Sequence, residues 1–426
     1  MQSFRLPTVR VWLQGIFLLA GAFVCTAVAT AQDEPDDEQR RIREIRIYIA
    51  DVYNDESAEE SSWANSVNRF HITTRESVIR THLLFKEGDI LDEELLKSSE
   101  RGLRRFKFLN KVEVSAVPVD EQTVDVEVQV KDAWSIEPGF DIKGGGDLYT
   151  INAHLIEFNL LGYGKKVFAE AVHETDVGTT MNYGYSDYQL FNSRYTADLR
   201  YKTGPLVESL YARVKLPLYS PDSKWSFGFT VQTADRIRRL FEDGEESSRY
   251  GEDNDHIYGY MKRSYGERYK KLNLTLSLDY NKSDYFTLGS ETTVAPPPDR
   301  GNVTPSVSLD KQNISWKKFT YVNKMGLTED NWVGLRYGGK LGYGFPVENG
   351  FEVWDTRLST AYNTAFANKQ LLKAKVGVIS EVVINTIVNV SANYYKKFNR
   401  HTVATRFLTK VGYDLDSSVQ FKLGAD

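Results

Sequence analysis

After Trp134 the chain is dominated by strict alternation of apolar and polar side chains, and this pattern limits its possible folds more than any other feature. In residues 225–232, for example, Trp225, Phe227, Phe229 and Val231 alternate with small or polar residues. Residues 195–201, 210–218, 272–280, 354–362 and 388–394 repeat the pattern. Successive side chains of a β-strand point to opposite faces, so a period of two predicts strands with one apolar face and one polar face. We therefore expect residues 134–426 to form antiparallel β-structure without helices.

Two folds satisfy this alternation. In a soluble sandwich the apolar faces form a core, whereas in a transmembrane barrel they contact lipid and the polar faces line a wet lumen. Strands of about ten residues, long enough to cross a bilayer when tilted, favour the barrel. So do aromatic residues near strand ends, in a chain with 25 Tyr, 22 Phe and 7 Trp.

The spacing between the predicted strands also favours the barrel. Tight turns at residues 162–164 and 191–193 contrast with what we interpret as long polar loops near residues 236–255 and 281–303. Such a barrel is expected to be closed, because lipid leaves an unpaired strand edge without hydrogen-bonding partners.

The N-terminus has the pattern of a secretory signal peptide, predicted over residues 1–31. Arg5 and Arg10 precede an apolar stretch at residues 11–28, and Ala29-Thr30-Ala31 matches a cleavage site. A retained membrane anchor is the alternative. The single cysteine, Cys25, lies inside this segment, so the mature chain would contain no disulfide. Residues 32–41 read as an acidic linker.

Residues 42–133 have a different pattern, which predicts a small α+β domain. Ile45, Ile47 and Ile49 indicate a strand, and Val78, Ile79 and Leu83 share one helical face. Asp92 is a suitable N-cap for a second helix over residues 93–105, and alternation at residues 112–116 and 124–130 predicts two more strands. Gly102 lowers helix propensity by about 1 kcal/mol relative to Ala, so we expect close packing there. The predicted order is β-α-α-β-β.

Several segments resemble the BamA/TamA-type outer-membrane protein assembly family, which combines periplasmic POTRA domains with a bacterial surface antigen β-barrel. Residues 84–92 (Leu-Phe-Lys-Glu-Gly-Asp-Ile-Leu-Asp), the helix that follows, residues 108–114 and residues 124–131 are similar to a POTRA domain. Pro138-Gly139-Phe140 and residues 158–165 (Phe-Asn-Leu-Leu-Gly-Tyr-Gly-Lys) are similar to the start of the family's barrel. The resemblance implies an antiparallel transmembrane β-barrel in the bacterial outer membrane, with residues 42–133 in the periplasm.

The chain departs from this family in three ways. Only one POTRA-like domain fits before the barrel, and the family's Arg-Gly-Phe/Tyr loop motif is absent. Residues 421–426 (Phe-Lys-Leu-Gly-Ala-Asp) are similar to the stretch that precedes that motif, which predicts a C-terminally incomplete sequence. The family's barrel has about sixteen strands, and the alternation marks about eleven to fifteen here. The higher count would instead suit a nearly complete, divergent barrel.

The resemblance implies two binding regions. The first is a sheet edge that would accept an extended client by strand addition: Val112, Glu113, Val114, Ser115, Ala116 and Val117. The second is a weakly paired first barrel strand acting as a seam: Phe140, Ile142, Gly144, Gly145 and Gly146. In the simpler alternatives, the strand of residues 112–117 only closes the small domain, and the glycines of residues 144–146 form an ordinary turn. The implied partners are unfolded or secreted protein clients, the lipid bilayer, and periplasmic chaperones or accessory subunits.

No catalytic or metal motif stands out. The six histidines form no metal-type pair, and phosphate-loop and nucleophile-elbow motifs are absent. Seven acids at residues 242–255 lack the spacing of a calcium loop, so we interpret them as a solvated loop (Glu242, Asp243, Glu245, Glu246, Glu252, Asp253 and Asp255). A net charge of −5 argues against nucleic-acid binding. We expect no enzyme activity and no cofactor.

The resulting hypothesis is an outer-membrane barrel that assembles, inserts or translocates proteins, with its periplasmic domain engaging clients. A passive diffusion pore with a structural periplasmic tether is the alternative. A soluble secreted all-β enzyme is a third possibility.

Overall fold

The computed structural model describes most of the chain beyond the N-terminal segment. The described residues are 40–52, 72–145, 148–242, 245–289, 294–320, 322, 328–347, 349, 352–366, 370–382, 385–398, 401–413 and 421–425. The predicted signal peptide, most of the acidic linker, and Gly146 of the predicted seam lie outside this range. Residues 40–426 form one compact unit.

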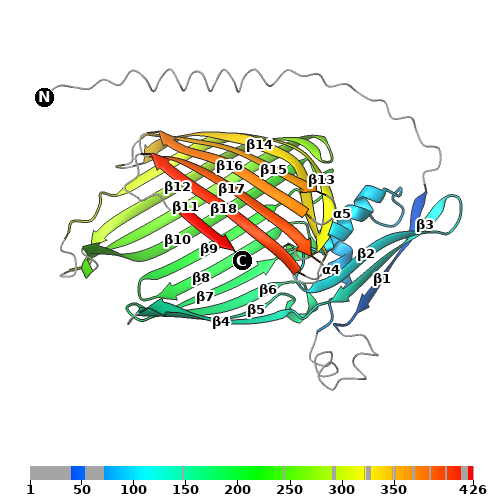
Figure 1. Ribbon diagram of the computed structural model, residues 1–426, viewed down its shortest axis with the longest axis horizontal. Coiled ribbons are helices and arrows are strands. Elements are labelled where there is room, and N and C mark those ends of the chain that lie inside the picture. The colour runs from blue at the N-terminus through cyan, green and yellow to red at the C-terminus, as the bar shows by residue number, and fades with distance from the viewer. Residues whose placement is uncertain are drawn as a thin grey trace, which may run out of the picture. The chain divides into compact units, whose positions relative to one another are not determined.

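The first elements of this unit form a small domain around a three-stranded sheet (Figure 1). They are β1 (Arg41–Ala50), α4 (Glu76–His82), α5 (Glu93–Leu103), β2 (Leu109–Pro118) and β3 (Thr123–Asp132). The sheet order is β1-β3-β2, with β1 parallel and β2 antiparallel to β3. The elements follow the predicted strand-helix-helix-strand-strand order.

Apolar side chains of this domain pack between the helices and one face of the sheet. Ile79 and Leu103 from the helices and Val126 and Val128 from β3 are completely buried. Asp92 caps α5, because its side chain accepts hydrogen bonds from the backbone amides of Glu94 and Leu95. The domain therefore has an apolar interior and a more polar surface, as water-soluble proteins do.

The expectation for Gly102 is wrong. A Cβ atom at this position would meet no atom within 4 Å, so close packing does not require glycine there. Gly102 is the penultimate residue of α5, where the helix is about to end and glycine is better tolerated than in the interior.

The remaining strands form a single sixteen-stranded antiparallel sheet in which chain neighbours are also sheet neighbours. Its first half contains β4 (Ile136–Gly145), β5 (Leu148–Glu157), β6 (Lys166–Glu174), β7 (Gly178–Asp187), β8 (Thr196–Gly204), β9 (Val207–Leu216), β10 (Trp225–Glu242) and β11 (Glu245–Glu267). Its second half contains β12 (Lys270–Thr287), β13 (Arg300–Thr320), β14 (Thr328–Val347), β15 (Val353–Phe366), β16 (Gln370–Val382), β17 (Asn385–Phe398), β18 (His401–Tyr413) and β19 (Phe421–Ala425). The sheet has one strand more than the upper predicted count.

The sheet curves round on itself, as Figure 1 shows. Its terminal strands are β4 and β19, and the described residues contain no pairing between them. The architecture therefore agrees with a β-barrel.

The two faces of this sheet have opposite polarity. The apolar side chains of the alternating strands are exposed on the outer face, including Leu199, Phe229, Leu278 and Leu358. The inner face holds buried polar side chains, such as Ser226, Asn273 and Ser306. Since the apolar faces are not packed against a second layer, the soluble sandwich does not describe this chain. Among the described residues, no helix is both long and apolar enough to cross a membrane.

Of the loops predicted near residues 236–255 and 281–303, the first is mostly strand, whereas the second keeps a connection outside the strands that includes residues 294–299. β10 continues to Glu242 and β11 begins at Glu245, β12 extends to Thr287, and β13 begins at Arg300. Apolar and polar side chains do not alternate regularly through residues 236–255, so no period of two marks these extensions, which are identified by their cross-strand backbone pairing.

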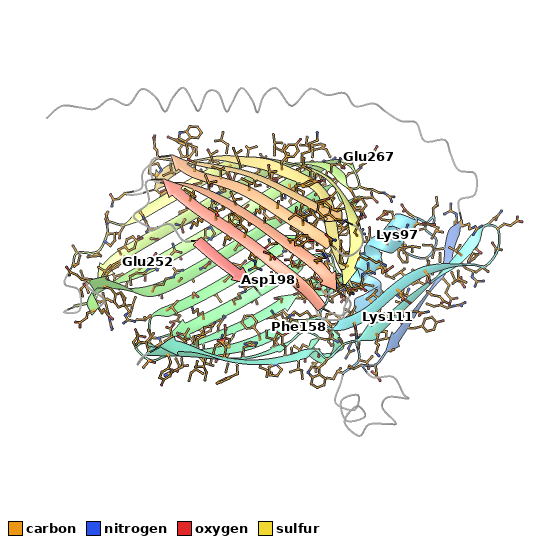
Figure 2. The ribbon with its side chains drawn as sticks, viewed as in Figure 1. Lys97, Lys111, Phe158, Asp198, Glu252 and Glu267 are labelled. Carbon is orange, nitrogen blue, oxygen red and sulfur yellow. The ribbon has the colours of Figure 1, made fainter. Side chains whose placement is uncertain are left out.

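Two acidic residues of the β10–β11 extension, Glu246 and Glu252, are paired with arginines. Glu252 pairs with Arg238 at 2.5 Å, and Glu246 pairs with Arg239 at 2.5 Å. Figure 2 shows Glu252 at the end of the sheet opposite Lys97 of α5. The described part of the acidic run belongs to paired strands, so its interpretation as a loop is wrong, although Glu242, Glu245, Asp253 and Asp255 are exposed as expected; Asp243 lies outside the described residues.

Candidate client-binding edge, sheet seam and domain junction

The predicted client-binding residues lie on an edge strand of the small sheet. Within the described residues, β2 pairs only with β3, so its other side carries unpaired backbone groups. Val112 is buried, and Val114 and Ala116 pack against the core, whereas Glu113, Ser115 and Val117 are exposed on the other face. An unpaired edge with an apolar and a polar side is the geometry that strand addition uses.

The opposite edge of the sheet, β1, is partly covered by the segment that precedes α5. The Ile42 amide donates to the Asp89 carbonyl at 2.9 Å, and the Ile45 amide donates to the Glu87 carboxylate at 3.2 Å. The Arg80 guanidinium donates to the Ile45 carbonyl at 3.2 Å. Because these groups already have partners, β2 is the more open of the two edges.

The predicted seam residues lie on β4, at one end of the large sheet. Phe140 and Ile142 are 68% and 61% exposed on the outer face. Gly144 and Gly145 are paired with Tyr149 and Leu148 of β5, in a ladder that runs the whole length of β4. The glycines therefore leave the β4–β5 ladder intact, and the unpaired side of β4 is the one that faces away from β5.

Two turns of the large sheet have the same conformation, thirty residues apart in the chain. In the first turn, amides of Leu160, Gly162 and Tyr163 donate to carbonyls of Lys165, Asn159 and Leu160. In the second, amides of Leu190, Asn192 and Ser193 donate to carbonyls of Tyr195, Gln189 and Leu190. Leu161 and Phe191 occupy the left-handed region in both turns, with φ of 53° and 54°. The β5–β6 and β7–β8 turns are thus a structural repeat.

Each of these turns directs one buried amide side chain to α4 of the small domain. Asn159 donates to the Thr74 hydroxyl at 2.9 Å, just before α4, and Gln189 donates to the Val78 carbonyl within it at 2.7 Å. The Thr74 amide in turn donates to buried Asp132 at the end of β3, at 2.8 Å. We call this set of contacts the α4 clamp. Buried polar groups with satisfied hydrogen bonds fix geometry strongly, because an unmatched partner is costly.

The close approach of the first turn requires glycine. A Cβ atom on Gly162 would lie 2.6 Å from the Thr73 carbonyl oxygen, and one on Gly164 would lie 2.9 Å from Val78. Both residues also have positive φ, of 78° and 64°. The glycines of the family-like turn therefore serve the contact between the turn and the small domain.

α5 is held at the same end of the sheet by charged residues. Arg104 forms a two-point ion pair with Asp330 of β14, with both N–O distances 2.8 Å, and Glu100 pairs with Lys318 of β13 at 2.8 Å. The side chains of Arg104 and Asp330 are less than a tenth exposed. Asp92 pairs with Arg268, and the Tyr269 hydroxyl contacts Glu94 and Arg101, in the β11–β12 turn. We call these contacts the α5 latch.

Two side chains in this junction, Asp92 and His82, have pKa values that their surroundings lower. The hydrogen bond from Arg268 holds the pKa of Asp92 below its ordinary value, with help from the amides that Asp92 caps. Burial, together with the nearby Arg194 and Arg105, lowers the pKa of His82 to about 3. His82 is therefore neutral at neutral pH, and it packs against Phe106 with a centroid separation of 4.6 Å.

The clamp and the latch were not predicted from the sequence. A signal for the clamp is present: Glu157-Phe158-Asn159-Leu160 and Asp187-Tyr188-Gln189-Leu190 share an acid-aromatic-amide-Leu order. The latch has no such signal, because its partners lie more than 160 residues apart. Within the parts of the chain that the structure describes, no group of His, Cys, Asp or Glu side chains could hold a metal ion.

Comparisons with known proteins give remote matches. No family model matches the chain, and no curated protein does. BamA from Haemophilus ducreyi lacking POTRA domains 1–3 is 11% identical with a TM-score of 0.35, over 99% of this chain and 93% of that one. CdiB from Escherichia coli is 10% identical with a TM-score of 0.37, over 100% and 98%.

CdiB from Acinetobacter baumannii is 11% identical with a TM-score of 0.43, over 88% of this chain and 64% of that one. This chain therefore matches less than two thirds of the length of that protein. At these identities and TM-scores the matches do not establish a family.

Proposed function

We propose that this protein is a bacterial outer-membrane β-barrel that inserts or translocates other proteins, and that residues 42–133 are a periplasmic POTRA-like domain. The observation that carries the proposal is an unpaired sheet edge, β2, in a domain anchored at one end of a sheet whose apolar face points outward. The outward apolar face suits hydrocarbon, and the edge suits an extended polypeptide.

Membrane insertion is supported by the polarity of the large sheet. Hydrocarbon favours a wall whose outer side chains are apolar and whose backbone hydrogen bonds are made between strands. The inner face carries matched charges, such as Asp198 with Arg213 at 2.7 Å and Asp355 with Lys340 at 2.8 Å. Such pairs are typical of a hydrated interior. The predicted signal peptide provides a route to the outer membrane.

Client engagement is supported by the anchoring of the small domain. The α4 clamp and the α5 latch fix the domain through its helices and leave β2 open. A client strand added to β2 would then be presented beside the sheet, and the β4–β19 seam is the place where it would join the wall. In the passive-pore alternative this free edge has no role.

The first test measures transport in cells that depend on this protein. Deletion of residues 42–131 should reduce outer-membrane protein levels or secretion severely. The deletion also removes the clamp and the latch, so insertion of the remaining barrel must be verified by protease resistance and heat-modifiable gel mobility. Unchanged client levels with a correctly inserted barrel would exclude the transport role.

The second test addresses the β2 edge without removing the domain. A photo-crosslinking residue replaces Ser115, and the matched control replaces Tyr48, which is 50% exposed on β1. Client adducts are expected at Ser115 and should be at least several-fold weaker at Tyr48, since β1 is partly covered. Equal adducts at both positions would show that strand addition at β2 is not the binding mode.

A further inference from the structure

A cavity of about 540 Å³ lies between the small domain and the inner wall of the large sheet. The small domain contributes the end of α5 and the segment before β2, and β6, β8, β9 and the β7–β8 turn contribute the wall. A second cavity, of about 450 Å³, adjoins it and shares Arg105, Gly102 and Tyr219 with it. We call the first cavity the cationic chamber because of its charged lining.

The lining of the cationic chamber is strongly unbalanced in charge. Its acidic side chain is Asp198, whereas its basic side chains are Arg105, Lys107, Lys166, Arg194, Arg213 and Lys215. Asp198 is already paired with Arg213 at 2.7 Å, and Lys107 is paired with Glu137 at 2.9 Å. Four basic side chains remain.

Among the described residues, none of these four cations forms a direct ion pair with a carboxylate, although the charge of Asp198 also acts on Lys166 and Lys215. Arg194 donates to the Leu83 carbonyl at 2.5 Å, and Lys166 lies over the rings of Phe158 and Phe168. Arg105 and Lys215 form no hydrogen bond or ion pair within the described part of the chain. Like charges that line one cavity repel one another, and an anion in the cavity would relieve the repulsion.

The position of Arg105 makes this arrangement unusual. Burial and the neighbouring Arg101 lower the pKa of the Arg105 guanidinium, yet the side chain stays accessible to water in the chamber. The nearby His82 is neutral, so it neither adds to nor offsets the charge. The chamber is thus a hydrated concave surface with excess positive charge, a shape that concentrates anions.

We propose that the cationic chamber binds an acidic segment of an extended polypeptide. The four cations come from four separate segments of the chain that line one cavity, so carboxylates carried at successive positions of an extended polypeptide could each meet a different cation. Phe106, Phe158, Tyr188 and Tyr219 line the same cavity and would provide apolar contacts for neighbouring side chains of the segment. This inference deepens the proposed function and rests on it, since the segment would belong to a client.

The experiment measures peptide binding to the full chain in detergent micelles by fluorescence anisotropy. The probe is a labelled twelve-residue peptide that alternates Glu with Leu and Ser, and the matched peptide has Gln at every Glu position. The test variant is Arg105→Gln with Lys215→Gln. The control is Lys86→Gln with Lys97→Gln, which removes two exposed cations elsewhere on the same domain.

The Glu peptide should bind, and the test variant should weaken binding about tenfold at low salt, while the control variant changes it less than twofold. Affinity should also fall as salt is raised. Equal binding of the Glu and Gln peptides, or an equal loss in both variants, would overturn the proposal. So would inorganic pyrophosphate that displaces the peptide at micromolar concentration, because the site would then favour a compact anion.

This assay does not depend on transport. If the Glu peptide binds as expected but no client in cells depends on the protein, the proposed function is refuted and the anion-binding role of the chamber stands. Loss of specific binding in a transport-competent protein would refute the chamber alone.

Discussion

The small domain and the large sheet use the same alternating pattern and bury opposite faces of it. In β3 of the small domain, Val126 and Val128 are 0% exposed. In β12 of the large sheet, Leu276 and Leu278 are 44% and 53% exposed, while Asn273 and Thr275 between the apolar positions are buried. A period of two therefore fixes that a strand has two faces, and the surrounding solvent decides which face is covered.

The difference extends to how each region is stabilised. The small domain has a contiguous apolar core of the kind that drives folding in water. The described part of the large sheet has no such cluster, and it depends on strand pairing around a polar interior and on an apolar outer surface. The cost of placing a charge at an apolar position should therefore depend on the surrounding medium in the large sheet, and should be independent of it in the core of the small domain.

The largest expected effect is in the core of the small domain. Val126→Asp places an unpaired carboxylate among buried apolar side chains and should cost about 4 kcal/mol or more. Gln129→Asp, on the exposed face of the same strand, should change stability by less than about 0.5 kcal/mol. Urea unfolding of the intact chain, followed by protease susceptibility of residues 40–132, measures both. Similar costs for the two variants would contradict the assigned core.

A smaller effect is expected on the outer face of the large sheet, and it should depend on the medium. Leu276→Lys should cost about 2–4 kcal/mol in phospholipid vesicles if the residue lies near the middle of the bilayer. In detergent micelles, where water reaches the surface more easily, the cost should be clearly less. Leu276→Met, which keeps an apolar side chain, is the control and should cost less than about 1.5 kcal/mol. A cost that is equal in vesicles and micelles would indicate that Leu276 does not face lipid.

The smallest of the three effects concerns the contact between the two regions. Asn159→Ala removes the donor to Thr74 and should cost about 1–3 kcal/mol. Hydrogen exchange should rise in α4 and in the β5–β6 turn, and it should stay unchanged in β12 and β13. Asn110→Ala, at an exposed position of β2, is the control. Unaltered exchange in α4 would mean that the clamp does not hold the domain.

Prediction from sequence succeeded where a local pattern carries the structure. The alternation at residues 272–280, the cap at Asp92 and the order of elements in residues 42–132 all depend on neighbouring residues, and each has its expected form. Prediction failed where strands pair through their backbones but carry no alternating side-chain pattern. The extensions of β10 and β11 through residues 236–255 lack a sustained alternation of apolar and polar side chains, so periodicity could not mark them as strand.

The candidate sites divide in the same way. The edge position of β2 follows from the order β1-β3-β2, and the resemblance of residues 84–131 to a known module was enough to select that strand. The cationic chamber could not be found in this way. Arg105, Lys166, Arg194 and Lys215 are separated by up to 110 residues, and each alone has the appearance of an ordinary surface cation.

By itself, the sequence determined that most of this chain is two-faced strand and that a small α+β module precedes it, because both properties follow from the spacing of nearby side chains. The tertiary structure decided which face of each strand is outside, how the two parts are joined, and where unpaired charge collects. These properties depend on residues far apart in the chain, such as Arg104 and Asp330, which come together only when the sheet has formed and the small domain lies against its end.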